Sequence, residues 1–231
     1  MSGTLVKNLQ KSLVKTMGIS FEKNPPMQND YKIVNGRLVW ANPNLYLEGF
    51  GDQWIDTGIK TASTLKVDIE YYRVSGGVFG FYGTIDGANK SFFYASSSAS
   101  AYARIGAWAT FNNSAWANET WLKLHLERGR TSCTINDVVF SSESGSKNTF
   151  DEGGSMYLFL YDGATTPNPM TGKIKQYKVT DGNDEVILHL VPVPAGLVIG
   201  ETTISANGMF DIVSQTFFAN QGTGDFGYGK I

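Results

Sequence analysis

The chain has 231 residues, is 42% hydrophobic and 13% aromatic, and carries a formal net charge of −2. The chain as a whole therefore lacks the positive charge that is typical of nucleic-acid-binding proteins. No apolar segment approaches the ~20 residues that a membrane-spanning helix needs. The single cysteine excludes an intramolecular disulfide, and the N-terminus lacks the long apolar segment of a secretory signal peptide. We therefore expect cytosolic synthesis and a globular domain, in which many aromatic residues suit strands and 26 glycines supply turns.

Residues 5–17 are predicted to form a short amphipathic helix. Apolar residues recur at intervals of three and four, and three lysines lie on a separate stripe. The apolar stripe is Leu5, Leu9, Leu13 and Met17, and the basic stripe is Lys7, Lys11 and Lys15. A helix this short is marginal alone, so its apolar stripe is expected to anchor the chain on a partner, whereas a frayed terminus is the alternative.

Residues 19–44 are expected to form a linker. The Pro25-Pro26 pair blocks a continuing helix and favours an extended path. Asn35-Gly36 predicts a small hairpin with arms at residues 31–34 and 37–40, because these residue types accept the positive φ of a tight turn.

From Tyr46 onward, short strands are expected at the spacing of a β-sandwich. Residues 65–72 and 122–127 alternate apolar and polar side chains, so each strand should expose one face to water. Residues 77–82, 91–94 and 102–108 are aromatic and weakly charged. Residues 174–180 and 186–193 are predicted to form a hairpin with a tight turn at Asp181-Gly182-Asn183-Asp184, in which the glycine takes the positive φ.

The last sixty residues also carry a recognisable order of motifs. A V-P-V-P element at residues 191–194 is followed by G-M-F-D-I-V at 208–213 and F-F-A-N-Q-G-T-G-D-F at 217–226. This order resembles the closing segment of concanavalin A-like (laminin G-like) jelly-roll domains of bacteriophage and prophage structural proteins. Residues 46–58 are similar to the opening strand pair of the same domains, so the resemblance covers Tyr46 to Ile231.

The resemblance implies an all-β fold, an antiparallel two-sheet jelly-roll sandwich over residues 45–231 whose last strands return to pair near the first. An N-terminal anchoring helix and linker would occupy residues 1–44. It further implies a virion structural protein, made in the host cytoplasm, of the tail- or head-associated fibre or decoration type. Its outward lectin-like domain would bind a host glycan, and its N-terminal segment would bind other virion proteins or form a homo-oligomer such as a trimer. The alternative is a secreted or surface lectin, or a degenerate glycosidase-like module.

Catalysis is not expected. Glycosidases of the concanavalin A-like fold usually carry an E-x-D-x-x-E strand, and this chain has none. Its nearest approach is Asp68 and Glu70, which Lys66 flanks on the same strand face, so a solvated face is favoured. His125 and His189 lack a second ligand at metal spacing and are interpreted as structural histidines. Cys133 is interpreted as a small buried strand residue.

No cofactor is predicted, with calcium kept as the alternative. Acids that suit calcium occur at three places that read as loops, although their spacing matches no dedicated site: Asp86, Asp151-Glu152 and Asp162. Candidate sugar-binding residues are aromatic, since a sugar ring can lie on an aromatic face. They are Tyr82, Phe93, Tyr94, Tyr102, Trp108 and Trp116. Burial in the core and in a subunit interface is the favoured explanation for these aromatics, ahead of a sugar platform.

Overall fold

The computed structural model describes residues 29–231 except 63, 73, 75–78, 85–90, 96–99, 106, 113–118, 127–131, 136–137, 142–153, 162–167 and 170. Every regular element within these residues is a β-strand, which confirms the all-β prediction. A search of the same residues finds no helix with the length and hydropathy to cross a membrane. The predicted N-terminal helix, with both of its stripes, lies outside the described residues.

In the described part of the chain, the larger sheet has ten antiparallel strands and a fork. Its main path runs in the order β12 (Val138–Ser141), β11 (Ser132–Ile135), β10 (Trp121–Leu126), β5 (Lys66–Tyr72), β16 (Thr171–Thr180), β17 (Val186–Val193), β20 (Gly208–Asp211) and β21 (Thr216–Phe218). The long strand β16 pairs on one side with β5 along most of its length. On the other side its first half pairs with β3 (Leu45–Phe50) and its second half with β17.

The smaller sheet has six antiparallel strands among the residues that the structure describes. Their order is β4 (Ile55–Lys60), β13 (Ser155–Leu158), β6 (Phe79–Thr84), β7 (Ser91–Ala95), β8 (Ser100–Ile105) and β9 (Ala107–Asn112). A short pair, β14 (Leu160–Tyr161) and β15 (Asn168–Pro169), forms a separate ladder. The successive strands β3 and β4 therefore belong to different sheets. The last strand, β22 (Gly227–Lys230), pairs with β3, which confirms that the end of the chain returns to the first strands of the sandwich.

The main core lies between the two sheets. Val67, Ile69 and Tyr71 of β5 are buried, and the residues between them are not, as the alternating sequence predicts. Ile55 of β4 and Leu158 of β13 belong to the same buried cluster, so the apolar faces of both sheets pack on each other. This arrangement confirms the antiparallel two-sheet sandwich.

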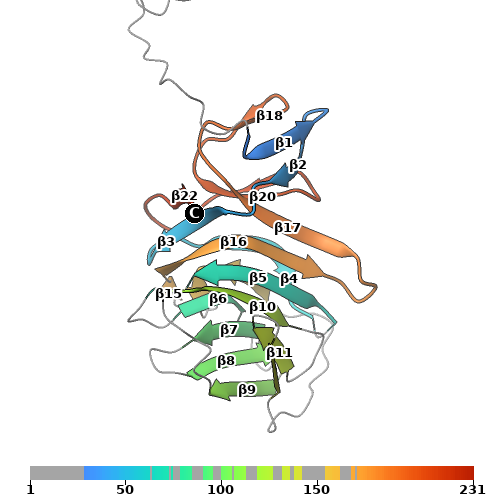
Figure 1. Ribbon diagram of the computed structural model, residues 1–231, viewed down its shortest axis with the longest axis vertical. Helices are drawn as coiled ribbons and strands as arrows, with labels where there is room; N and C mark the ends of the chain where they lie inside the picture. Colours follow the sequence, from blue (N-terminus) through green and yellow to red (C-terminus); the bar gives the residue numbers. More distant parts are fainter. Residues whose placement is uncertain are drawn as a thin grey trace, which may run out of the picture.

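A second, smaller core holds the N-terminal hairpin on the other face of the fork. The hairpin consists of β1 (Tyr31–Val34) and β2 (Arg37–Ala41), and positive φ values at Asn35 and Gly36 confirm the predicted turn. It lies at the same end of the molecule as β18 (Val198–Ile199), which pairs with β19 (Thr202–Thr203) (Figure 1). The residues of this core are Tyr31, Leu38, Leu45, Val191, Val193, Ile199, Ile204 and Phe210.

Hydrogen bonds fasten the hairpin to the sandwich. The Gln215 amide donates to the Leu38 carbonyl (2.9 Å) and accepts from the Leu38 N–H (2.8 Å). The Tyr31 hydroxyl donates to the carbonyl of Pro192 (2.9 Å) and lies 2.8 Å from the Tyr228 hydroxyl. Residues 31–41 are therefore packed against the strands that follow residue 45, whereas the division of the chain into domains at residue 45 stays a prediction.

The β16–β17 hairpin exists as predicted, but a different residue takes the positive φ. That residue is Asp184, with φ 68°, and Gly182 is not among the positive-φ glycines. The Asp181 carboxylate instead accepts the backbone N–H groups of Asn183 and Glu185 (2.8 and 2.9 Å). The connection is thus the five-residue loop 181–185, which includes the predicted turn residues and is organised by the Asp181 side chain rather than by the glycine.

The closing motifs have a structural explanation. Asp211 is 1% exposed, and its carboxylate accepts the backbone N–H groups of His189, Val213 and Ser214. The Asn220 side chain accepts the N–H groups of Trp54 and Gly222 (3.1 and 2.8 Å). These contacts fold the closing segment onto the turn between β3 and β4. The motif residues Asp211 and Asn220 therefore serve the fold.

Candidate functional site

The outer face of the larger sheet, which is turned away from the main core, carries a row of titratable residues across four strands. His125 of β10 pairs with Asp68 of β5, Asp68 pairs with Lys178 of β16, and Lys178 pairs with His189 of β17. These residues share one face because cross-strand partners in a sheet point to the same side. Three of them line a depression of about 220 Å³.

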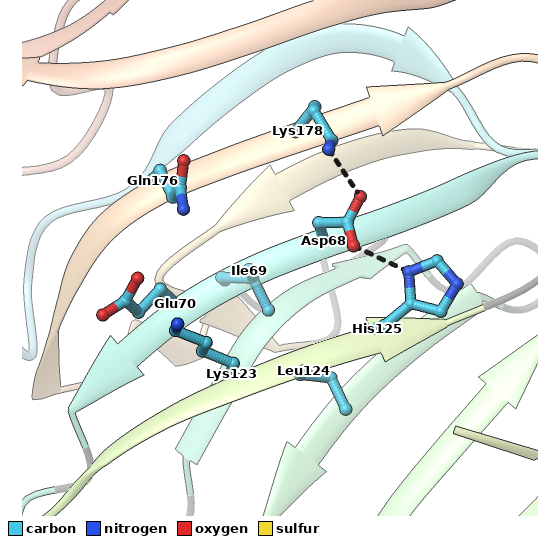
Figure 2. A pocket seen from close by; sticks show the side chains of 8 residues that line it. All are labelled: Asp68, Ile69, Glu70, Lys123, Leu124, His125, Gln176 and Lys178. Atoms are coloured by element: carbon cyan, nitrogen blue, oxygen red, sulfur yellow. Dashed lines mark hydrogen bonds and ion pairs between the residues drawn. The ribbon is translucent and has the colours of Figure 1, made fainter. Parts of the chain in front are cut away.

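Asp68 lies at the centre of this depression. Its carboxylate is 2.6 Å from His125 Nδ1 and 3.1 Å from Lys178 Nζ. Figure 2 shows the two partners reaching Asp68 from the neighbouring strands on either side. Partial burial raises the pKa of Asp68, but the hydrogen bonds from His125 and Lys178 outweigh it and hold that pKa below its usual value. Asp68 is therefore a stable anion that orients two cation-forming side chains.

A β-bulge brings a second ion pair onto the same face. The pairing of β16 with β5 shifts between Ile174 and Gln176, which leaves Lys175 as the extra residue of the bulge. Lys175 donates to Glu70 Oε1 at 2.8 Å, and its ammonium lies 4.4 Å from the centre of the Trp121 ring. The Lys175 side chain is only 8% exposed, so it is held between a carboxylate and an aromatic face.

Aromatic residues continue this face beyond the bulge. The Trp121 ring lies 5.4 Å from that of Tyr72 and 5.9 Å from that of Tyr46. Lys173 lies over both tyrosine rings, 4.6 Å from the centre of Tyr46 and 5.4 Å from that of Tyr72. Because lysines already cover these rings, we interpret the cluster as a rigid support for Lys173 and Lys175.

A second depression of about 330 Å³ adjoins the first, and Gln176 lines both. Its lining includes Trp40 of the hairpin strand β2, Asn42 directly after that strand, and His189 of β17. Trp40 is 45% exposed although it is large and apolar. The β1–β2 pairing shifts at Val39, and such a bulge re-aims the neighbouring side chains. Leu38 is thereby buried in the second core while Trp40 borders the depression. The two depressions together are called the outer groove.

His189 connects the two parts of the outer groove. Its Nε2 lies 3.4 Å from the Gln176 side-chain oxygen, and its partner across the ladder is Lys178. Burial and the nearby charge of Lys178 hold the pKa of His189 below its usual value, although Asp211 and Asp68 act in the opposite direction. The neutral imidazole can donate from one nitrogen and accept at the other.

The structure places the backbone of five of the six predicted sugar-binding residues on adjacent strands of the smaller sheet. Tyr82 of β6 pairs with Phe93 of β7, and Tyr94 of β7 pairs with Tyr102 of β8. Trp108 lies on the next strand, β9. Trp116 lies outside the described residues, as do the predicted calcium-binding acids Asp86, Asp151, Glu152 and Asp162. The sugar platform on this sheet stays a prediction.

The outer groove is a site that sequence reasoning missed. His125 has no second ligand at metal spacing in the sequence, yet it contacts Asp68, a residue 57 positions away. The alternation of β5 and β10 places both residues on the polar faces of their strands, which is a usable signal. The register that aligns them is not visible in the sequence. Within the described residues, no three His, Cys, Asp or Glu side chains gather as a metal site would require.

No family model matches this chain, and no curated protein matches it. A solved structure of similar fold is that of a putative carbohydrate binding protein from Bacteroides ovatus, with a TM-score of 0.53 and 12% sequence identity. The match covers 80% of this chain and 60% of the other protein, so the chain spans well under the full length of that neighbour. At this identity the likeness shows the fold alone. A bacteriophage origin finds no support in these comparisons.

Proposed function

We propose that this protein is a carbohydrate-binding β-sandwich whose ligand lies in the outer groove. The observation that carries the proposal is the exposed ring of Trp40 beside Gln176, Asn42 and His189. Sugar rings present apolar C–H faces together with hydroxyl groups, so they suit an aromatic wall next to planar polar side chains. Sites of this kind combine apolar walls with a few placed hydrogen-bonding groups.

The fold agrees with this proposal. The Bacteroides ovatus neighbour is a putative carbohydrate binding protein, and its fold is similar to this one. The alternative expected from the sequence, a lectin or a degenerate glycosidase-like module, is therefore favoured over the more specific virion assignment. Ligand binding, rather than the virion role, is what the groove geometry supports.

Affinity gel electrophoresis against a panel of neutral and acidic polysaccharides tests the proposal. We expect at least one polymer to retard the protein and Trp40→Ala to weaken that retardation about tenfold or more, since the variant loses a central aromatic contact. Phe50→Ala is the matched control, because Phe50 is also an exposed aromatic residue (57%) but does not line the groove. Equal effects of the two substitutions, or no retardation by any polymer, would contradict the proposal.

The groove is proposed to bind without hydrolysis. A glycosidase needs a carboxylic acid whose pKa is raised, and the pKa of Asp68 is lowered. Glu70, the other carboxylate of the groove, is paired with Lys175. Incubation of the protein with the polymers that bind it should release no new reducing ends. Release that disappears in Glu70→Gln would show instead that the groove is catalytic.

The virion role remains a second proposal, supported by the resemblance of residues 172–231 to phage jelly-roll domains. In that setting the segment before residue 29 would attach the domain to a particle or join copies of the chain. Deletion of residues 1–20 should leave a folded, soluble domain that keeps its glycan binding but changes its oligomeric state or no longer assembles. An unchanged oligomeric state and normal incorporation would show that this segment is not the anchor.

A further inference from the structure

The charges in the outer groove point to the class of sugar. Three lysines line it, Lys123, Lys175 and Lys178, against two carboxylates, Asp68 and Glu70. The whole chain has a net charge of −2, so this local balance runs against the composition of the protein. An excess of cations around a depression raises the local concentration of anionic ligands.

The two carboxylates of the groove already have cationic partners. Asp68 is held by His125 and Lys178, and Glu70 is held by Lys175 at 2.8 Å. The negative charges of both carboxylates are therefore balanced by neighbouring cationic side chains, and this reduces their repulsion of an anionic ligand. The same ion pairs fix the positions of the Lys175 and Lys178 ammonium groups before any ligand arrives.

Lys178 and His189 are the best placed donors for an anion. They are cross-strand partners on β16 and β17, so one group lying above the sheet can contact both. The Lys178 side chain is 37% exposed, and its ammonium has three donors, of which Asp68 takes one. His189 lines the same depression as Trp40, and Lys178 lines the adjoining one, so the donor pair spans the two parts of the groove.

We propose that the outer groove selects acidic glycans, with the anionic group of a sugar bound by Lys178 and His189 and the sugar ring against Trp40. This inference rests on the proposed glycan binding and adds the chemical class of the ligand. The anionic group can be the carboxylate of a uronic acid or a sulfate ester, since both accept charge-assisted hydrogen bonds from Lys and His.

The experiment compares polygalacturonate with the same polymer after chemical reduction of its carboxyl groups, and includes dextran sulfate as the sulfated probe and dextran as its neutral counterpart. Binding is measured by calorimetry with the full chain. We expect at least one anionic polymer to bind about tenfold or more tightly than its neutral counterpart, which corresponds to the loss of one charge-assisted hydrogen bond. We also expect that affinity to fall as salt is raised from about 50 to about 500 mM.

Substitutions then separate a site from a general charge effect. Lys178→Met should weaken binding of the anionic polymer about tenfold or more, and Lys178→Arg should restore most of it. Lys60→Met removes the same charge from β4 of the opposite sheet, where Lys60 is exposed, and should have little effect. Equal losses in Lys178→Met and Lys60→Met would overturn the inference.

The outcomes distinguish this inference from the proposal on which it rests. If each neutral polymer binds as tightly as its charged counterpart and Trp40→Ala still weakens binding, glycan binding stands and acidic selectivity is wrong. If no polysaccharide of either kind binds, the proposed function itself fails. If only the sulfated probe binds in a Lys178-dependent way, acidic selectivity stands and the anionic group is a sulfate.

Discussion

The closing segment, residues 208–226, and the outer groove both gather polar side chains, but they use them in different ways. In the closing segment, Asp211 and Asn220 bond to backbone N–H groups. In the groove, Asp68 bonds to the partly exposed side chains of His125 and Lys178, whereas the Glu70–Lys175 pair is largely buried. Buried side chain–backbone bonds satisfy groups that would otherwise be orphaned, so they stabilise the fold. Exposed ion pairs contribute little stability and remain accessible to a ligand.

The largest effect is expected at Gly222. A Cβ placed there would lie 1.9 Å from the Asp52 carbonyl oxygen, and this backbone atom cannot move aside as a side chain can. Gly222→Ala should therefore cost about 3 kcal/mol or more and leave little folded protein. Gly182→Ala is the control, since its nearest neighbour would be a Thr64 side-chain atom at an ordinary 3.5 Å. Denaturant unfolding of both variants measures the difference. Similar stabilities would show that the close packing of Gly222 on Asp52 is not required for the stability of the fold.

The next effect is expected at Asp211. Asp211→Ala leaves three backbone N–H groups around a buried position without their acceptor, which should lower the free energy of unfolding by about 2–4 kcal/mol. Asp211→Asn keeps an acceptor at the Oδ1 position, which serves His189 and Val213, so it should cost less. Equal losses in the two variants, measured by urea unfolding, would mean that the hydrogen bonds do not govern the effect.

Substitution of Asp68, unlike that of Asp211, is expected to affect ligand binding more than the stability of the fold. The Asp68 side chain is 36% exposed, so Asp68→Asn should change the free energy of unfolding by no more than about 1 kcal/mol. The same change releases Lys178 and His125 from their common partner and should alter glycan affinity measurably. A large loss of stability with unchanged glycan binding would show that Asp68 serves the fold, as Asp211 does, and not the binding site. Thermal unfolding and calorimetric titration of the same preparation provide both quantities.

The smallest effect is a pH dependence at His189. Its folded-state pKa is held below the ordinary value of 6.5, so below that pH the unfolded chain takes up a proton that the folded chain resists. The free energy of unfolding should therefore decrease as the pH falls from about 7.5 to about 5.5. For a chain of this size, each kcal/mol lost lowers Tm by about 2–4 °C, so the decrease can be followed by thermal unfolding. His189→Gln removes this contribution and keeps a polar side chain. A variant whose Tm falls as steeply as that of the parent would show that His189 does not contribute.

The amino-acid sequence by itself determined the fold class and much of the strand pattern. The alternation of residues 65–72 predicts which side of β5 is buried, because strand side chains point to opposite faces in turn. Asn35-Gly36 predicts the N-terminal hairpin, since both residues tolerate a positive φ. These are local properties of the chain, and a local pattern is enough to reveal them.

The tertiary structure alone decided where the candidate site lies. Asp68 meets His125 and Lys178 only through the pairing of β5 with two strands that are distant in sequence, and a shift of one residue in either register would separate them. Trp40 borders the groove only because the hairpin packs on the outer face of the fork. Register and packing depend on the whole hydrophobic core, so no short motif in the sequence records them. For the groove, the sequence therefore shows only which strand faces are polar, whereas the closing segment, whose side-chain bonds are mostly local, carries a clear motif.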